Sequence, residues 1–426
     1  MILEVNVQTL SEVSREVEIT TTAEELKPHF DKAYREFRPK ADIRGFRKGK
    51  APLDIVKKLY GDLIEHEALP EVAGILYKQA IEENDLKPIG EPVIVDMNYT
   101  RGEQFRVKIQ YDVRPTIEVG KYKGVSIEKP VYTITDEHVE REIERLRRIH
   151  STLSETDAVT DDEHVVSATL QEMDPSGVPL IGKNTQKARF YLADPKLEEP
   201  FHNALKASEK GGEYRVAFED KHGDHTHTVN LKLTVDKIEK VTLPEFSSEF
   251  VNKITSGKST DVEAFRKSIH DDLVSYWNER SRRQMIDALA AELLRIHEFQ
   301  APESLVRNVL ESLLEEVKQQ YPKKELPHGF DIGRFNEQNR AYAIYQSRWA
   351  LLREELIKAE DLTAEESDLV AIAEREAPRM GIDKDRLLNY YKSSDQMKDR
   401  IVGDKLIELL LSHAKIKEVK ATPAES

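Results

Sequence analysis

The sequence predicts a multidomain α+β protein: a mixed α/β domain first, a small antiparallel β domain in the middle and an elongated all-helical region last. Three observations predict this class. The chain has 426 residues, which is too long for one hydrophobic core. Charged residues make up 34% of it against 39% hydrophobic, so much of the chain must lie on a surface. The spacing of the apolar residues also changes along the chain, from mixed to strand-like to helical.

The composition excludes several classes of protein. The formal net charge is -15, from 64 Lys plus Arg against 79 Asp plus Glu, and both signs are interspersed among regular apolar positions, which favours folding over disorder. The chain has no cysteine, so disulfides, thiolate catalysis and zinc–thiolate sites are excluded. The first residues lack the apolar run of a secretory signal, and no run of about 18 apolar residues predicts a membrane span. We expect a cytoplasmic protein with no membrane partner.

The first domain begins with a strand over residues 15–20. Thr22 and Glu25 then have the spacing of a capping box, which predicts a helix that runs to about residue 37. A loop over residues 39–51 follows, and Pro52 suits the first turn of a second helix that runs through residue 60.

Two more helical stretches lead to Pro88, and strands follow at 93–96 and 104–113. The second of these strands has the clearest β signal in the chain, because apolar residues at every odd position from Phe105 to Val113 alternate with polar ones. One face of this strand should therefore pack on helices while the other meets water.

The rest of the chain divides by texture. A strand at 125–134 and a helix at 136–149 form a connector, and short strands with turn signals occupy the next part. Beyond Pro244 the pattern is helical, with capping boxes expected at Thr260/Glu263 and Thr363/Glu366. The predicted domains are 1–115, a connector at 116–155 that packs with the last domain, a β domain at 156–242 and a helical domain at 243–426, ending in a polar tail from residue 420.

A basic loop in the first domain carries the functional signal. In the run from Ile43 to Pro52, two glycines bracket Phe46, Arg47 and Lys48, so a tight loop can present an aromatic ring and two cations at its tip. Residues 27–58 hold 11 cations and 4 anions, a local net charge of +7.

Such a patch attracts phosphate-rich partners, with nucleic acid as the leading class. A solvated basic helix pair with Phe46 in a core is the structural alternative. A nucleotide-binding P-loop is excluded, because only three residues separate Gly45 from Gly49 and Ala51 follows the lysine.

The run from Gly45 to Pro52 resembles the G-F-R-x-G-K-x-P signature of the trigger factor family, and the resemblance extends over the whole chain in domain order. It implies an ATP-independent chaperone that docks at the tunnel exit of the large ribosomal subunit, touches ribosomal RNA and a protein there, and binds nascent and unfolded polypeptides. The resemblance implies no cofactor, and family precedent favours a homodimer off the ribosome. The implied ribosome-binding residues are Gly45, Phe46, Arg47, Lys48, Gly49, Lys50 and Pro52.

The middle domain of the family is an FKBP-like peptidyl-prolyl isomerase, and here the sequence departs from the pattern. Residues 168–172, 177–182 and 199–203 stand where active members carry an aspartate–phenylalanine pair, a glycine-rich stretch and an I-P-G-F turn. Tyr191, Phe201 and Phe218 are candidates for a residual pocket or for ordinary core. Isomerisation needs a dry apolar site rather than an acid or base, so we expect weak or no activity and assign no catalytic residue.

Two further groups of residues are candidates for a metal site and for a client-binding surface. Three alternate histidines, His222, His225 and His227, are better explained as a hairpin tip than as a metal site, because no ligand set is complete around them. The helical domain has interrupted apolar stripes suited to weak, unselective contact with clients. The candidates for that surface are Val309, Leu313, Tyr342, Tyr345, Met397 and Ile401.

Two other functions stay open at this point. A prolyl isomerase whose helices merely recruit substrates predicts robust activity from residues 156–242 alone. An RNA-binding scaffold without folding activity predicts salt-sensitive binding to naked RNA and no suppression of aggregation.

Overall fold

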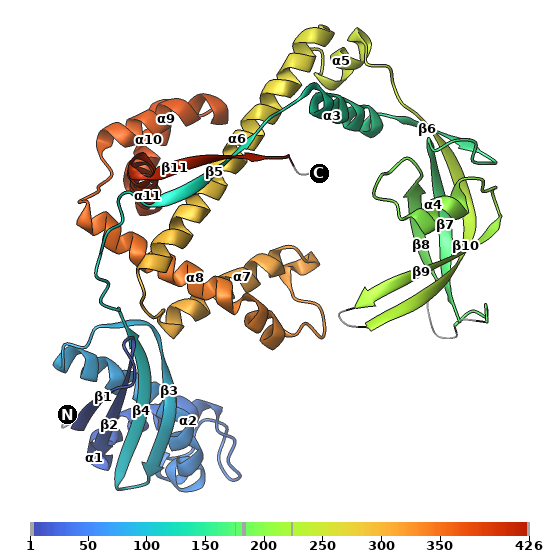
Figure 1. The fold of residues 1–426 in the computed structure, drawn as a ribbon. Helices are drawn as coiled ribbons and strands as arrows, with labels where there is room; N and C mark the ends of the chain where they lie inside the picture. Colours follow the sequence, from blue (N-terminus) through green and yellow to red (C-terminus); the bar gives the residue numbers. More distant parts are fainter. Residues whose placement is uncertain (1–3, 175, 181–184, 223–224, 424–426) are drawn as a thin grey trace. The chain divides into compact units, whose positions relative to one another are not determined.

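The computed structural model describes residues 4–174, 176–180, 185–222 and 225–423, and at 220–222, 225–227 and 322 it describes the backbone alone. The chain divides into two compact units (Figure 1). Unit 1 is Met1–Lys129 with Gln284–Lys417, and unit 2 is Pro130–Arg283 with Glu418–Ser426.

The amino-terminal part of unit 1 is a four-stranded antiparallel sheet covered on one face by two helices. The sheet order is β1-β2-β4-β3, and the register places Val17 opposite Ile109 and Ile19 opposite Val107. Alternation puts these side chains on the face that the helices cover. The elements are β1 Glu4–Thr9, β2 Ser14–Thr22, α1 Ala23–Phe37, the short 3-10 helix Arg38–Lys40, α2 Leu53–Glu83, β3 Pro88–Thr100 and β4 Gln104–Val113.

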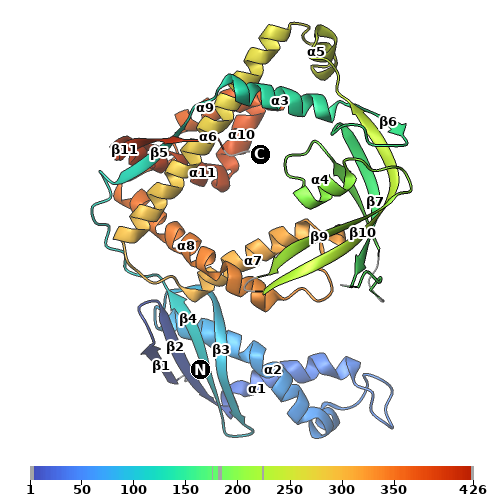
Figure 2. The same ribbon diagram turned by 45° about the vertical axis from the view of Figure 1, so that its right-hand side comes forward.

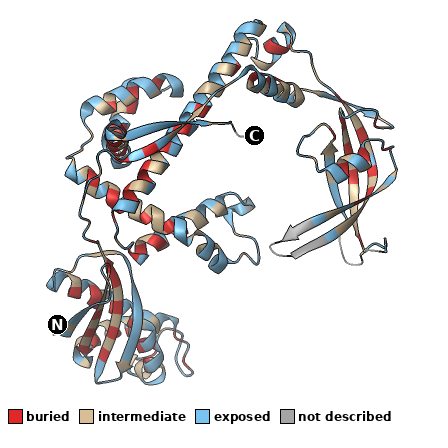
Figure 3. Cartoon of the chain, in the orientation of Figure 1, coloured by how far each residue is buried: buried red, intermediate tan, exposed pale blue. Residues whose placement is uncertain are grey.

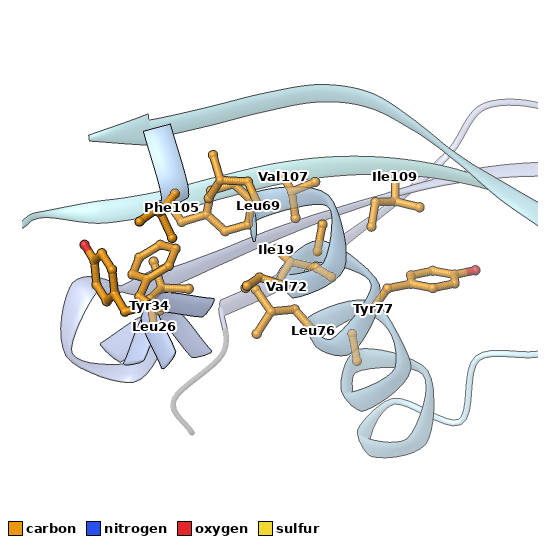
Figure 4. Packing of buried hydrophobic residues seen from close by; sticks show 14 of the residues in the cluster. Ile19, Leu26, Tyr34, Leu69, Val72, Leu76, Tyr77, Phe105, Val107 and Ile109 are labelled. Carbon is orange, nitrogen blue, oxygen red and sulfur yellow. The ribbon is translucent and has the colours of Figure 1, made fainter. Parts of the chain in front are cut away.

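The core of this sheet and helix pair is continuous. Figure 4 shows Ile19, Val107 and Phe105 from the sheet packed against Leu26 of α1 and Leu76 of α2. All five are fully buried, and each contributes about 1.5–3 kcal/mol of transfer free energy relative to an exposed side chain. In Figure 3 the buried residues of this sheet lie along β2 and β4. The α1–α2 pair is thus seated on a rigid base.

Two expectations for this region are wrong. Thr22 makes no capping hydrogen bond; instead the hydroxyl of Thr21 donates to the Glu25 carboxylate at 2.8 Å. The helical stretches predicted between Pro52 and Pro88 form one helix of 31 residues, α2, which continues through Pro70. The residues around this proline are buried against the sheet, and their packing offsets the lost backbone hydrogen bond.

The carboxyl-terminal part of unit 1 is a body of helices. Leu289 and Leu293 of α6 pack against Leu352 and Leu356 of α8 and Leu406 of α11, and all five are fully buried. Figure 2 shows the same helices from a second side. The elements are α6 Val262–Ile296, whose first part to Arg283 belongs to unit 2, α7 Glu303–Gln319, the 3-10 helix Pro322–Lys324, α8 Ile332–Ala359, α9 Glu366–Met380, α10 Lys384–Ser393 and α11 Asp395–His413.

The caps predicted for two of these helices are displaced. Asp261, not Thr260, accepts the backbone N–H of Ala264 at 3.0 Å before α6. Glu365 and Asp368, not Thr363 and Glu366, form the capping box of α9. In a chain this rich in acid, a neighbouring carboxylate takes the place of the threonine hydroxyl and also favours the positive end of the helix dipole.

The last residues also differ from expectation. Strand β11, Lys415–Ala421, pairs with β5, Ser126–Tyr132, although the sequence predicts a helical domain that ends in a polar tail from residue 420. The N–H of Lys415 donates to the carbonyl of Val125 at 2.8 Å. The residues after 423 are outside the described part of the chain.

The sheet and the helical body are joined at the start of α7. The carboxylate of Asp112, at the end of β4, accepts the backbone N–H of Ser304 at 2.6 Å, and both residues are buried. Pro302 at the N-cap of α7 offers no side-chain acceptor, so Asp112 does the work of a capping residue from another element. The Ser304 hydroxyl also donates to the carbonyl of Ile89 at 3.3 Å.

Unit 2 holds the β domain and the helices at its ends. Five antiparallel strands form its sheet, with order β6-β10-β7-β8 and β9 paired to β10, around a core that includes Val166, Leu205, Leu233 and Ile238. The side chains of His222, His225 and His227 lie outside the described residues. The elements are α3 Asp136–Ile149, β6 Thr152–Thr156, β7 His164–Met173, β8 Gln186–Tyr191, α4 Glu199–Leu205, β9 Glu213–His222, β10 His225–Thr242 and α5 Ser248–Ile254.

The chain enters and leaves unit 2 at neighbouring points. The hydroxyl of Ser281 donates to the carbonyl of Pro130 at 2.5 Å, and the rings of Tyr132 and Trp277 lie 4.5 Å apart. Residues 130–283 of unit 2 are therefore inserted between the two segments of unit 1, and the two ends of this insertion are held side by side.

Candidate functional site

The basic loop, residues 43–52, joins α1 to α2 and consists of two successive β-turns. The N–H of Phe46 donates to the carbonyl of Ile43 at 3.0 Å, and the N–H of Lys50 donates to that of Arg47 at 2.8 Å. The third position of each turn is a glycine with positive φ: Gly45 at 93° and Gly49 at 76°. A residue with a Cβ atom is strained in this conformation, so the two glycines give the loop its shape.

Buried residues anchor both ends of this loop. Ala41, Ile43 and Ala51 are 4%, 6% and 2% exposed, and the N–H of Gly49 donates to the carbonyl of Ala41 at 3.1 Å. The tip between the anchors faces solvent, with the Phe46 side chain 42% exposed. The alternative in which Phe46 is a core residue is therefore wrong.

The cations of the loop are available to a partner, whereas others in the basic segment are already paired. Lys57 binds Asp31 at 2.7 Å, and this hydrogen bond lowers the pKa of the Asp31 carboxyl. Lys32 binds Glu71 at 2.9 Å. Among the described residues no carboxylate pairs with the exposed loop cations, which are Arg44, Arg47, Lys48 and Lys50. The loop thus offers four exposed cations to which no described carboxylate is bound.

Two exposed leucines of α2, the helix that follows the loop, were not predicted from the sequence. Leu59 and Leu63, at i and i+4 on α2, are 58% and 51% exposed. The neighbouring residues Val56 and Ile64 are buried and belong to the core. In the sequence these leucines form a second apolar stripe beside the stripe that packs in the core. An amphipathic helix needs only one such stripe for packing, so the second stripe could have indicated an exposed apolar surface.

The candidates for a client surface have mixed surroundings. Tyr342 is 51% exposed, and Val309, Leu313 and Tyr345 are half-buried, with Tyr345 against the core of the helical body. Ile401 is 3% exposed inside a small core of α9, α10 and α11, and Met397 packs on the same core. Ile401 is therefore not available to a client. The sequence prediction is wrong here because a wide apolar stripe on a helix does not show which part of the stripe a neighbouring helix covers.

Other apolar side chains of the helical body are more exposed than these candidates. Met380 and Tyr390, on α9 and α10, are 56% and 64% exposed. A hollow of about 460 Å³ is lined by apolar Ile286, Trp349 and Ile407. Its other lining residues are mostly polar or charged: Arg353, Gln396, Asp399, Arg400, Gly403 and Asp404. Such a mixed, open surface suits weak binding of varied peptides better than selection of one ligand.

Of the aromatic candidates of the β domain, Phe201 and Phe218 lie together and Tyr191 lies apart from them. Phe201 stacks on Phe190 at 5.2 Å and contacts Phe218 at 5.5 Å, and it is 9% exposed. Tyr191 follows Phe190 in β8 and so lies on the other face of the sheet. Its hydroxyl donates to Glu163 at 2.5 Å, and the Arg148 guanidinium lies over its ring. Burial is the main cause that raises the pKa of Tyr191.

No described helix is long and apolar enough to cross a membrane. Within the same residues no three His, Cys, Asp or Glu side chains are grouped so that they could hold a metal ion.

Comparison with known proteins identifies relatives of this chain. Family models of the bacterial trigger factor protein match residues 3–146 and, for its carboxyl-terminal part, residues 261–412. A trigger factor of Salinibacter ruber is 30% identical over 423 residues, covering 94% of this chain and 91% of the relative. One of Chloroherpeton thalassium is 29% identical over 422 residues, covering 97% of both. A solved structure of the trigger factor chaperone covers 96% of this chain and 99% of its own, at 19% identity and a TM-score of 0.47.

The match to the Salinibacter ruber relative is the strongest of these in sequence identity and extends over nearly the whole of both chains. The chain thus belongs to the trigger factor family of ribosome-associated chaperones.

Proposed function

We propose that this chaperone docks on the large ribosomal subunit through the basic loop and holds nascent chains at the tunnel exit. The observation that carries the proposal is the loop itself: two glycine turns on buried anchors present an exposed Phe46 ring among four cations that pair with no described carboxylate. A chain with a net charge of -15 has no general affinity for RNA, so this local reversal of charge marks the contact.

The two kinds of side chain on the loop suit two kinds of partner. Each cation that neutralises a phosphate of ribosomal RNA releases counterions, which provides affinity at low salt without sequence preference. The Phe46 ring gains most from an apolar recess, which a ribosomal protein at the tunnel rim provides and RNA backbone does not. In this proposal the tip residues Phe46, Arg47 and Lys48 make the contact, while Gly45, Gly49, Lys50 and Pro52 shape and support it.

The helical body supplies the client surface in this proposal. Exposed Tyr342, Met380 and Tyr390 and the hollow beside Trp349 offer apolar contact interspersed with charge. Contacts of this kind bind unfolded segments weakly, so that clients leave without ATP. Off the ribosome, the same surfaces favour a homodimer. A cytoplasmic location follows from the ribosome as the docking partner.

A substantial isomerase activity is not part of the proposal. Phe190, Phe201 and Phe218 pack mainly on each other, and Tyr191 is engaged on the opposite face of the sheet. These contacts support the interpretation that the aromatic residues form the core of the β domain. In this proposal the β domain adds to the client surface and has little or no catalytic activity.

Ribosome co-sedimentation tests the docking site. The triple variant Phe46→Ala/Arg47→Ala/Lys48→Ala should lose at least about tenfold in affinity, because it removes one apolar anchor and two charge contacts. Tyr321→Ala/Lys323→Ala/Lys324→Ala is the matched control, since it removes an exposed aromatic ring and two exposed lysines from the segment between α7 and α8. Equal pelleting of the loop variant and the wild-type protein would overturn the proposal.

A further inference from the structure

A buried carboxylate lies between the two helices that carry the basic loop. Glu65, in α2, is 6% exposed and accepts from three side chains: the hydroxyl of Tyr34 from α1, the hydroxyl of Tyr99 from β3 at 2.8 Å, and Arg101 through Nε at 3.1 Å and Nη2 at 3.3 Å. Arg101 is also paired with Asp62. One side chain thus connects α1, α2 and the end of β3.

The cluster is built for this carboxylate. A buried charge destabilises the fold unless it is paired and hydrogen-bonded, and here charge and donors are both supplied. Gly61 leaves the space: a Cβ atom there would lie 2.5 Å from Nη2 of Arg101 and 3.4 Å from the Tyr34 hydroxyl oxygen. Burial, followed by the hydrogen bond to Glu65, raises the pKa of Tyr34 to about 12, so its hydroxyl remains a donor at neutral pH.

The cluster is linked to the stems of the loop through the last turn of α1 and the first turns of α2. Tyr34 is in the last turn of α1, and α2 begins at Leu53 after the loop. Nζ of Lys57, in the first turns of α2, lies 4.9 Å above the centre of the Tyr34 ring and binds Asp31 of α1. Tyr34 therefore contacts Glu65 through its hydroxyl and Lys57 through its ring. These two contacts hold α1 at two positions along the first half of α2.

Apolar packing alone does not fix this geometry. The contacts between α1, α2 and the sheet are non-directional, and a small slide of one helix along the other changes their area little. Hydrogen bonds to one carboxylate are directional and permit a single register. A slide of α1 would strain the hydrogen bond that joins the two stems of the loop, in which the N–H of Gly49 donates to the carbonyl of Ala41.

We infer that Glu65 is a positioning residue for ribosome docking: together with Tyr34 it holds the α1–α2 pair in the register that presents the basic loop. This rests on the proposed docking function of the loop. Glu65 itself is buried and touches no partner, so its effect on binding is exerted through the geometry of the loop.

Tyrosine-to-phenylalanine variants provide the test, because they leave the volume of the ring unchanged. Tyr34→Phe and Glu65→Gln should each weaken ribosome binding about three- to tenfold, the loss expected when one charge-assisted hydrogen bond ceases to hold the docking geometry. The double variant should bind no worse than Glu65→Gln alone, since both changes break the same link. Tyr77→Phe is the matched control: Tyr77 is a buried tyrosine of α2 whose hydroxyl has no hydrogen-bond partner among the residues that the structure describes.

Two readouts separate positioning from general loss of stability. Hydrogen exchange in Tyr34→Phe should increase in residues 38–52 and stay unchanged in β4. The slope of log affinity against log salt should equal that of the wild type, because every cation is retained, whereas Arg47→Ala/Lys48→Ala should flatten it.

The outcomes are distinguishable. If the triple loop variant loses binding while Tyr34→Phe and Glu65→Gln bind like the wild type, the positioning role is wrong and the docking proposal stands. If the triple variant binds normally, the docking proposal itself fails.

Discussion

Two glycines of the basic loop share a positive φ but differ in their surroundings. A Cβ atom at Gly49 would lie 2.9 Å from the carbonyl oxygen of Pro39, whereas one at Gly45 would meet nothing within 4 Å. Gly49→Ala combines strain with a backbone clash and should destabilise the base of the loop by about 2–4 kcal/mol, against about 1 kcal/mol for Gly45→Ala. Hydrogen exchange over residues 38–52 should therefore increase far more in Gly49→Ala.

Ribosome binding should follow the same order in the two glycine variants. Gly45→Ala serves as the control because it changes the same kind of turn at the same kind of position. Equal exchange in both variants would show that the contact with Pro39 has no role in holding the loop.

Single residues are predictable where the deciding interactions are local. The loop tip follows from glycine spacing, since each turn is closed by residues three apart. Burial of Ile401 and exposure of Leu59 are not predictable in this way, because both depend on which helix covers a stripe. The hydrogen bond of Tyr34 to Glu65 spans 31 positions and has no signature in the sequence.

At the scale of elements, Asp112 caps a helix to which it does not belong. Asp112→Ala should lower stability by about 1–2 kcal/mol, because the N–H of Ser304 is buried and loses its acceptor. The first turn of α7 should exchange its amide hydrogens faster, and the melting temperature should fall by a few degrees.

Asp96→Ala is the comparison for this variant. Asp96 is an exposed carboxylate on the same sheet, paired with Arg106 at 3.2 Å, and its removal should change stability by less than about 0.5 kcal/mol. A melting temperature that Asp112→Ala leaves unchanged would mean that solvent satisfies the start of α7.

Elements with strong periodicity match the sequence prediction closely. The strand at 104–113 and the helix at 136–149 were expected with the bounds that β4 and α3 have. Helix starts are less predictable, because Thr-x-x-Glu spacing recurs by chance in an acidic chain and the adjacent Asp261 or Glu365 does the capping. The continuation of α2 past Pro70 depends on packing against a sheet whose strands lie elsewhere in the chain.

At the scale of the whole molecule, residues 130–283 of unit 2 are an insertion with adjacent ends. Replacing residues 131–280 by a short Gly/Ser linker should leave unit 1 folded, since Pro130 and Ser281 are already in contact. The shortened chain should unfold cooperatively and retain the hydrogen-exchange protection of β4 and α8.

The control is a chain in which the same Gly/Ser linker replaces residues 284–296 instead. This replacement removes Leu289 and Leu293 from the core of the helical body. That chain should lose the cooperative transition. If the chain without residues 131–280 also loses it, unit 1 depends on the insertion for its stability.

The four successive domains expected at 1–115, 116–155, 156–242 and 243–426 remain a prediction, and the division into two units adds what a reading along the chain does not contain. Composition and periodicity report only on neighbours in sequence. They give no sign that residues 284–417 return to the unit that contains residue 1, because that return is made by contacts such as Arg114 with Glu354.

The hydrogen bond between Asp112 and Ser304 also bears on the order in which the protein folds during synthesis, because the two residues are 192 positions apart in the chain. A ribosome that synthesises this protein completes the amino-terminal sheet long before α7 exists, and β5 waits for the last residues to bring its partner β11. Until then the apolar faces that the helical body will cover stay open at the tunnel exit. Every new copy of this chaperone thus passes through a stage in which it resembles the unfinished chains that earlier copies receive.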